Sequence, residues 1–210
     1  MMLKYEELNL QQVVSERDPF TEERYRQFYH FLPANVRTVL DIGCNTGKGG
    51  QVLKSLNQSL QISGLDCVKD RLERLPSQAY QEGIHGLSTN IPCGDRTFDV
   101  VVAGEFIEHL YPIDVDKTLA EVFRVLKIGG RFLLTTPNPL DIKKKIRGES
   151  VLDDESHVSQ HFHDALKWKL KMIGFSRIKV YGSGKVSRYL GYYFPLLHVY
   201  GSYLAMGDKK

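Results

Sequence analysis

The sequence predicts an α/β fold in which helices flank a doubly wound sheet of seven strands, most of them parallel. Two runs, residues 38–42 and 98–103, carry almost no side chain that a strand would present to water. Such runs are typical of parallel strands buried on both faces. A glycine-rich turn and a helical pattern follow the first run, as in a strand–turn–helix unit. The length of 210 residues suits one domain, residues 1–210.

Composition and charge exclude several classes of protein. The net charge of +3 is too small to indicate nucleic-acid binding. Cys44, Cys67 and Cys93 are irregularly spaced and form no C-x-x-C, so neither a disulfide framework nor a zinc cage is expected. Residues 1–10 lack the apolar core of a signal peptide, and no stretch reaches the roughly 18 apolar residues of a membrane span. A cytoplasmic protein is therefore expected.

The turn after the first strand is the first candidate for a binding site. Gly43 and Gly47 follow the strand, and backbone can approach a ligand closely at such a turn. Asp41 would place a carboxylate at its mouth, where it could accept from an amine. The turn is too short for a phosphate loop, and Asn45 stands where a dinucleotide fingerprint needs its second glycine. Both of those loops are therefore disfavoured.

The second strand, residues 61–66, ends on an acid. Asp66 lies roughly 20 residues beyond the glycine turn, the spacing at which a Rossmann-type fold places a carboxylate on ribose hydroxyls. Cys67 follows and could flank an adenine ring. A surface acid in a turn is the simpler alternative, but it explains neither the spacing nor the strand before it.

The fourth strand, residues 98–103, leads into a cluster of titratable side chains. On a helix, Glu105, Glu108 and His109 would fall at positions i, i+3 and i+4 and share one face. That face would lie at the carboxyl edge of the sheet. The remaining expected elements are a helix over 69–81 interrupted by Pro76, strands over 85–88, 131–136, 175–181 and 201–207, and helices over 113–126 and 165–173.

Three stretches of the chain resemble the class I methyltransferases that use S-adenosylmethionine. These are Asp-Ile-Gly-Cys-Asn-Thr-Gly at 41–47, Glu-Phe-Ile-Glu-His-Leu at 105–110, and the Leu-Lys-x-Gly-Gly segment that runs to Thr-Pro at 126–137. The resemblance implies a Rossmann-like sheet with five parallel strands and a terminal antiparallel hairpin. It also implies S-adenosylmethionine as cofactor. The cofactor-binding candidates are Asp41, Gly43, Cys44, Asn45, Gly47, Asp66, Cys67, Ser88, Asn90 and Glu105.

Two of these candidates replace a residue that the chain lacks. The family usually has an acid near the third strand that contacts the adenine amine, and no acid stands there in this sequence. Ser88 and Asn90 are offered as substitutes, since both side chains can hydrogen-bond an amine.

The resemblance also predicts the reaction. We expect O-methylation of a small-molecule, glycan or isoprenoid-like acceptor, for which the protein must align the reactants and exclude water. His109, beside Glu108, is the candidate base, because imidazole titrates near neutrality. Alternatively, the chain resembles the ubiquinone-pathway O-methyltransferases and some RNA 2′-O-methyltransferases, which carry the same Glu-x-x-Glu-His pattern and a later histidine. That resemblance implies that a divalent ion such as Mg²⁺ is held by Glu105, Glu108, His109 and His157, with His161 as an alternative to His157. The simpler alternative is that these side chains only shape the pocket.

Three segments lie outside the strand–helix repeat. Tyr25 and Tyr29, in the first of them, are candidates for a lid, although a core-facing stripe is the simpler interpretation. The basic run 143–147 could contact an anionic substrate or membrane headgroups, whereas a solvated helix face is the default. The segments are residues 1–35 as a helical cap, 140–164 as a substrate-side insertion, and 182–200 as a second cap.

Two other classes of function are open from the sequence. A NAD-dependent oxidoreductase shares the strand–turn–helix unit and Asp66, but needs the second glycine that Asn45 replaces. A non-catalytic accessory protein would bind the cofactor without turnover. An RNA substrate is disfavoured by the modest charge.

Overall fold

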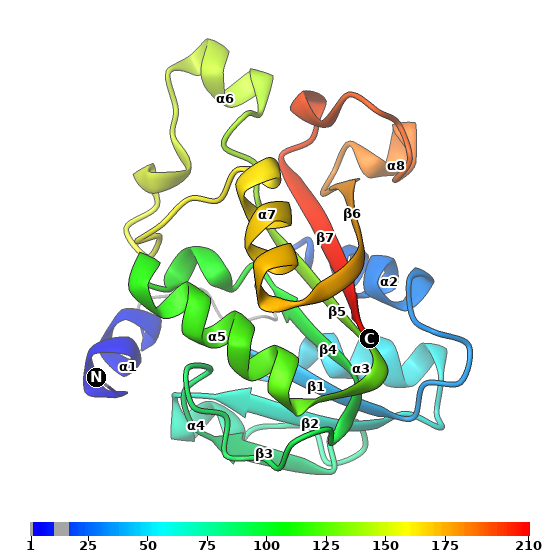
Figure 1. The fold of residues 1–210 in the computed structure, drawn as a ribbon. Helices are drawn as coiled ribbons and strands as arrows, with labels where there is room; N and C mark the ends of the chain where they lie inside the picture. The colour runs from blue at the N-terminus through cyan, green and yellow to red at the C-terminus, as the bar shows by residue number, and fades with distance from the viewer. Residues whose placement is uncertain (1, 11–16) are drawn as a thin grey trace.

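The computed structural model describes residues 2–10 and 17–210, which form one mixed sheet with helices on both faces (Figure 1). The strand order is β3-β2-β1-β4-β5-β7-β6. The first five strands pair in parallel and the last two pair antiparallel, which confirms the predicted sheet and hairpin. The strands are β1 Thr38–Ile42, β2 Gln61–Asp66, β3 Glu82–His85, β4 Phe98–Gly104, β5 Leu126–Pro137, β6 Phe175–Ser183 and β7 Ser202–Lys209.

The helices divide between the two faces of the sheet. Helices α1, α5 and α7 contribute to one core layer, and α2 and α3 contribute to the other. Alternate residues of β1 serve the two layers, because Leu40 and Ile42 pack in the first and Val39 in the second. The helices are α1 Met2–Leu10, α2 Thr21–His30, α3 Lys48–Leu56, α4 Lys69–Leu72, α5 Pro112–Val125, α6 Ile142–Arg147, α7 His163–Ile173 and α8 Ser187–Leu190, with 3₁₀ turns η1 Ile107–His109, η2 Val151–Asp153 and η3 Leu197–Val199.

The sheet brings the carboxyl ends of β1, β2 and β4 together. Strand β1 lies between β2 and β4 and is parallel to both, with Ile42 beside Leu65 on one side and Ala103 on the other. Ligands of open α/β sheets bind outside this edge. The glycine turn after β1 and the turn after β4 therefore face the same space.

Several elements differ from the expectation, and the third strand spans Glu82–His85 rather than 85–88. The helix expected over 69–81 is only four residues long, because Pro76 lacks an amide donor and disfavours helical geometry in the residue before it. Strand β5 begins at Leu126 rather than 131, and its pairing with β4 shifts in register between Phe98 and Val100. A side chain at Gly130 would lie 2.9 Å from the Asp99 carbonyl oxygen, so glycine permits this close approach.

Asp99 joins β4 to the start of β1 and gives a prediction about acid stability. Its carboxylate accepts from the Thr38 amide at 2.8 Å, the Arg37 amide at 3.0 Å and Lys127 Nζ at 2.8 Å. Burial alone would raise the pKa of Asp99, but these donors lower it from 3.8 to about 2. A depressed carboxyl pKa stabilises the fold above the unfolded value, and this contribution is lost as the pH falls from 3.8 toward 2.

Asp99→Asn is expected to lower the free energy of unfolding at pH 7 by about 1–2 kcal/mol, allowing for partial exposure. The difference from wild type should shrink below pH 3.8. Urea unfolding at several pH values measures both effects, and the exposed Asp70→Asn on α4 is the control. An equal loss at pH 2 and pH 7 would contradict this account.

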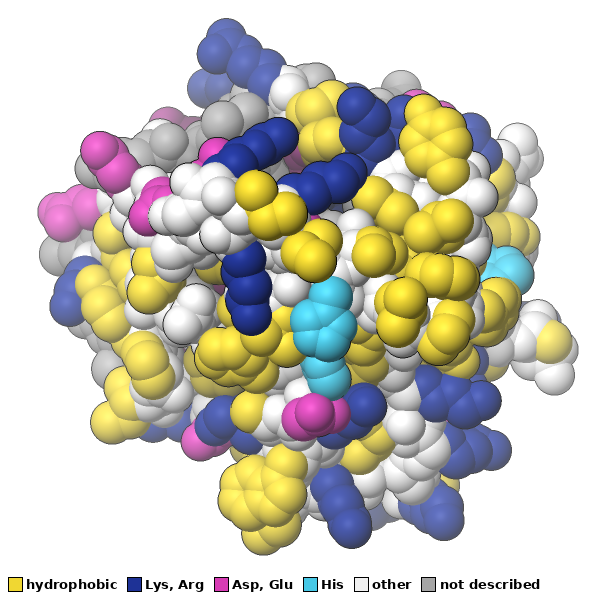
Figure 2. All heavy atoms as spheres, turned by 90° about the horizontal axis from the view of Figure 1, so that it is seen from above, with side chains coloured by type: hydrophobic (Ala, Val, Ile, Leu, Met, Phe, Trp, Pro, Cys, Tyr) yellow, Lys and Arg dark blue, Asp and Glu magenta, His cyan; other side chains and the backbone are white. Residues whose placement is uncertain are grey.

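The segments outside the repeat gather around the carboxyl edge. Residues 140–164 contain α6 and η2, and residues 182–200 contain α8 and η3. Figure 2 views this end of the molecule, where hydrophobic side chains alternate with Lys and Arg over much of the surface. The expected cap over 1–35 includes α1 and α2, while its residues 1 and 11–16 lie outside the described residues. Within the described ranges, no helix combines the length and apolar character that crossing a bilayer requires.

Candidate functional site

The turn after β1 requires a glycine at position 43. Gly43 has φ +67° and lines both cavities described below, and a Cβ there would lie 2.5 Å from the Phe106 ring. The amides of Gly43 and Cys44 donate to the Leu65 carbonyl at 2.8 and 3.2 Å, which ties the turn to β2. Only glycine suits this backbone and this contact. The turn therefore presents bare backbone to the cavity.

Asp41 lies below the turn rather than at its mouth. Its two carboxylate oxygens accept from the Tyr25 hydroxyl at 2.6 Å and the Tyr80 hydroxyl at 2.5 Å, and the residue is fully buried. Burial raises its pKa to about 6. Asp41 lines neither cavity, so the expectation that it meets an amine directly is wrong in this structure. The sequence could not reveal this, since the tyrosines come from distant segments.

The same two tyrosines support the start of α3. The Gly50 amide donates to the Tyr80 hydroxyl at 2.9 Å, and a Cβ at Gly49 would lie 2.1 Å from the Tyr25 ring. Tyr25 and Gly49 line the larger cavity, whereas Gly47 lines neither and is the left-handed residue that begins α3. Tyr29 packs against the core and also lines neither cavity.

Asp66 lines both cavities at the end of β2. Its carboxylate accepts from the Asn45 amide at 3.0 Å and the Val68 amide at 2.9 Å. Burial raises its pKa, although these amides oppose the shift. A carboxylate has about four acceptor positions, so two remain for further donors. Asp66 is thus held in one orientation and can accept two hydroxyls.

The smaller cavity extends from Asp66 between the sheet edge and α1. Cys67 lines it, as do Leu87 and the aromatic ring of Tyr5 from α1. Ser88 lines it too, but its hydroxyl is hydrogen-bonded to Thr118 at 2.8 Å. Asn90 is exposed and lines neither cavity, so the structure does not place it at the predicted site.

The larger cavity, about 340 Å³, joins the glycine turn to α2 and to the segment after β4. Asn45 and Cys44 line it from the turn, and Glu105 and His109 line it from the segment after β4. Asp154, Ser156 and His157 close the opposite side, so part of the 140–164 segment does reach the site.

Glu105 does not share a helical face with Glu108 and His109. Its backbone has φ +47°, and only Ile107–His109 form a 3₁₀ turn, so the expected helix is wrong. Glu105 Oε1 is buried and accepts no hydrogen bond from any described residue. A non-glycine residue with a positive φ is strained, so the surrounding structure must hold it in place. Such residues often occur at functional sites.

Arg24 is a residue that the sequence did not reveal. It lines the larger cavity from α2, with its Nε 3.8 Å from Glu105 Oε1 and its Nη1 3.0 Å from Asp18. Burial alone would lower the pKa of Arg24, but these two carboxylates more than offset it, and the pKa is raised. A cation and a carboxylate, each only partly exposed, therefore lie side by side in the cavity wall. The sequence carries no signal for this pair beyond an arginine on a helix.

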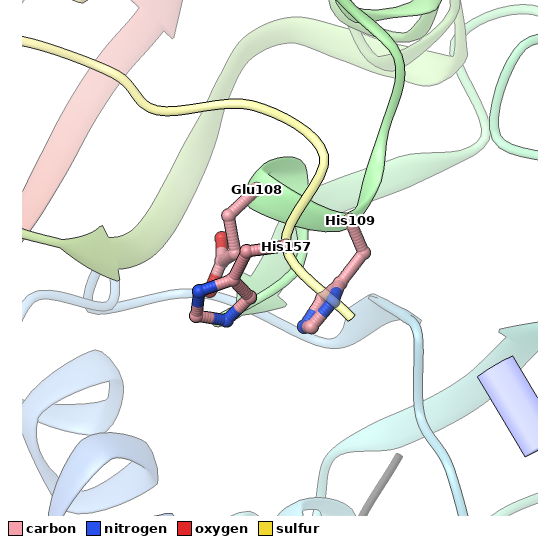
Figure 3. A group of neighbouring side chains, drawn as sticks. All are labelled: Glu108, His109 and His157. Carbon is pink, nitrogen blue, oxygen red and sulfur yellow. The ribbon is translucent and has the colours of Figure 1, made fainter. Parts of the chain in front are cut away.

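Three other side chains converge on the opposite part of the site (Figure 3). Glu108, His109 and His157 each place one potential ligand atom within 4.8 Å of the others. Glu108 is fully buried, and only its Oε2 accepts, from Thr136 at 3.0 Å, while Oε1 has no hydrogen-bond partner among the described residues. Burial, and then the charge of Glu105, raise its pKa well above the usual value. His161 is not part of this cluster; its Nε2 is within hydrogen-bond distance of the Ser159 hydroxyl and the Ile107 carbonyl.

Both histidines of this cluster are oriented by backbone carbonyls. His109 Nδ1 is 2.9 Å from the Ser156 carbonyl, and His157 Nδ1 is 2.7 Å from the Val151 carbonyl. Each Nδ1 therefore donates, which leaves Nε2 as the atom of each neutral ring that could bind a metal. Burial lowers the pKa of His109 to about 4, which keeps it neutral at pH 7 but makes it a weak base.

The donor atoms suit a transition metal better than magnesium. Two imidazoles and one carboxylate form a usual set for Zn²⁺ or Fe²⁺, and metal-bound histidines commonly donate their other N–H to a carbonyl, as here. The three ligand atoms lie within 4.8 Å of one another, so these side chains could together hold one ion. Mg²⁺ prefers oxygen ligands, and the expected fourth ligand Glu105 is not among the three that cluster. Mg²⁺ is therefore not supported.

Solved structures define the class of fold. The chain is similar to a SAM-dependent methyltransferase from Archaeoglobus fulgidus, with a TM-score of 0.71, 20% identity, and coverage of 90% of this chain and 93% of that one. It is also similar to a possible histamine N-methyltransferase from Thermotoga maritima, with a TM-score of 0.69, 19% identity, and coverage of 100% and 96%. At these identities the likeness concerns the fold, which is that of the Rossmann-like methyltransferases.

Sequence comparison defines the family. Residues 40–134 match the model of the methyltransferase domain family. The chain is 35% identical to a fatty-acid O-methyltransferase of Mycolicibacterium smegmatis, over 54% of this chain and 43% of that protein. It is 30% identical to a ubiquinone/menaquinone biosynthesis C-methyltransferase of Haemophilus ducreyi, over 70% and 64%. Residues 40–134 thus match a methyltransferase domain, and the curated relatives and the fold support a class I S-adenosylmethionine-dependent methyltransferase. The matches span half or less of the first curated relatives.

Proposed function

We propose that this protein transfers the methyl group of S-adenosylmethionine to an oxygen of a small amphipathic acceptor. The observation that carries the proposal is the larger cavity, which joins the glycine turn and Asp66 to Glu105, His109 and His157. A cofactor bound along the turn would direct its reacting end toward the two histidines. Methyl transfer from a sulfonium needs alignment and exclusion of water more than covalent assistance.

Asp66 and the paired charges beside α2 match the two ends of the cofactor. Asp66 would accept the ribose hydroxyls, and the smaller cavity beside Cys67 and Leu87 would hold the adenine. The amino-acid end carries one ammonium and one carboxylate group. Glu105, with its unpartnered oxygen, would accept from the ammonium, and Arg24 would donate to the carboxylate. The ligand would thereby pair with two charged groups that lie 3.8 Å apart in its absence, one of them with a buried, unpartnered oxygen.

The acceptor side is proposed to hold a divalent transition metal. Glu108, His109 and His157 would be the ligands, and an ion bound there would lower the pKa of an acceptor hydroxyl or orient it. The carbonyls of Ser156 and Val151 keep the two rings in place. If no ion binds, His109 would be the acceptor's hydrogen-bond partner, and its low basicity would favour an acceptor that is already acidic.

Titration with Zn²⁺ and Mn²⁺ tests the metal site. We expect wild type to bind with a rise of several degrees in its unfolding midpoint, because a ligand of the folded state stabilises it. His157→Gln should weaken binding about tenfold or more, while His198→Gln, at an exposed histidine, should not. If His157→Gln and His198→Gln bound the metal with equal affinity, the proposal that this cluster is a metal site would be wrong.

Calorimetric titration of S-adenosylhomocysteine, followed by transfer of a labelled methyl group to hydroxylated lipids and phenols, tests the reaction. Micromolar binding and turnover with an acceptor are expected. Binding without turnover on any acceptor would favour a non-catalytic accessory role. No binding by the folded wild type would overturn the proposal.

A further inference from the structure

Two surface segments beside the site form one continuous face. Helix α6 contacts η3, and the buried Asn138 joins the two by donating to the Leu197 and Tyr200 carbonyls, each at 2.9 Å. We call the surface formed by residues 142–148 and 184–200 the α6–α8 face. It lies at the top of Figure 1 and is seen from above in Figure 2.

The α6–α8 face exposes large apolar side chains. Ile146 is 80% exposed and Tyr189 is 78% exposed, and Tyr193 is 64% exposed. Such side chains gain little by facing water, and tyrosines are enriched where proteins meet the headgroup region of a bilayer. The other large apolar side chains exposed on this face are Ile142, Leu190, Phe194 and Leu196.

The charges of the face all have one sign. Residues 142–148 and 184–200 contain six Lys and Arg and no Asp or Glu. Arg188 is paired with Glu23 at 2.8 Å, and Arg147 lies 3.8 Å from Glu149. The four lysines form no ion pair with any described residue, so their charge is available to a partner. The lysines are Lys143, Lys144, Lys145 and Lys185.

We propose that the α6–α8 face docks on an anionic membrane surface. Interleaved cations and interfacial apolar side chains are the combination that binds anionic headgroups, with each cation contributing about 1 kcal/mol near the surface. The opposite sign of a phospholipid headgroup complements the four unpaired lysines. The exposed tyrosine, leucine and isoleucine side chains would enter the boundary between headgroups and acyl chains.

Docking would bring the site to a lipid-borne acceptor, an inference that rests on the proposed function. The segment after α6 carries Asp154 and His157 into the larger cavity. On the other side, Ser187 and Arg188 of α8 bind Glu23 of α2 at 3.1 and 2.8 Å, beside Arg24. The face is therefore linked to the cavity wall at two places, through the segment that follows α6 and through α2. The acceptor class that this arrangement fits is an amphipathic lipid whose hydroxyl lies near the membrane surface.

Co-sedimentation with vesicles of phosphatidylcholine, with and without phosphatidylglycerol, tests the proposal. Wild type should bind only the anionic vesicles, and about 0.5 M salt should weaken this binding by screening. The variant Ile146→Ser/Lys145→Gln should bind about tenfold more weakly. Tyr189→Ser, on the other half of the face, should bind about threefold more weakly.

The matched control is Ile128→Ser/Lys69→Gln, which removes the same two residue types elsewhere. Ile128 is 62% exposed at the amino end of β5, away from α6 at its carboxyl end, and Lys69 is exposed on α4. No binding by wild type, or equal binding by the face variants and the control, would overturn membrane docking. So would a dimer in solution that Ile146→Ser/Lys145→Gln dissociates. Binding of S-adenosylhomocysteine, measured in parallel, should be unchanged in every variant, which separates this proposal from the proposed reaction.

Discussion

Asp66→Ala is expected to weaken binding of S-adenosylhomocysteine by about 100-fold or more. A hydrogen bond to a charged group contributes about 1.5–3 kcal/mol, and the carboxylate has room for two ribose hydroxyls. Its orientation is set by the amides of Asn45 and Val68, so the bound geometry needs little rearrangement. Calorimetric titration measures the change.

The same carboxylate also supports the glycine turn, so a control must separate binding from folding. Asp66→Asn keeps one acceptor oxygen for the turn and should weaken binding about tenfold. Asp70→Ala removes an exposed acid from nearby α4 and should bind as wild type does. If both Asp66 variants kept wild-type affinity while remaining folded, the ribose assignment would be abandoned.

Arg24→Met is expected to weaken S-adenosylhomocysteine binding by about 30-fold or more. The guanidinium lies beside Glu105 with its side chain 13% exposed, and a hydrogen bond from it to the ligand carboxylate would contribute about 1.5–3 kcal/mol. Methylthioadenosine lacks the amino-acid end of the cofactor. Its affinity should therefore change little, because nothing in that ligand would contact Arg24.

Arg26→Met is the matched control, since Arg26 is on the same helix and its side chain is 53% exposed. It should leave both affinities unchanged. Equal weakening of the two ligands by Arg24→Met would show that Arg24 supports the fold of α2 rather than the amino-acid end of the cofactor. The comparison of the two ligands by calorimetry decides between these roles.

The parts of the fold that depend on nearby residues could be predicted from the sequence. Strand β1, its glycine turn and α3 were predictable because buried apolar residues and glycines are adjacent in the chain. Asp66 lies at the cavity because its position follows from the end of β2. The shortened α4 was signalled by Pro76.

The residues whose observed positions differ from the prediction are placed by contacts with residues distant in the sequence. The Asp41 carboxylate accepts hydrogen bonds from the hydroxyls of Tyr25 and Tyr80, and no local sequence pattern predicts either contact. The Glu105 backbone leaves helical geometry where its amide bonds to Thr135 of β5. Arg24 becomes a site residue only because α2 packs over the turn. Only the family resemblance predicted His157 as a ligand. Its place beside Glu108 and His109 depends on the conformation of residues 150–157, which no local sequence pattern specifies.

The buried carboxylate of Asp41 has a mechanical consequence. Through two phenol groups it fastens α2, the loop that carries Tyr80 and the start of α3 to one point beneath the glycine turn. Moving α2 or the Tyr80 loop away would leave the Asp41 carboxylate buried without one of its hydrogen-bond donors, which is energetically costly. The floor of the proposed cofactor site is therefore expected to resist deformation when a ligand enters or leaves.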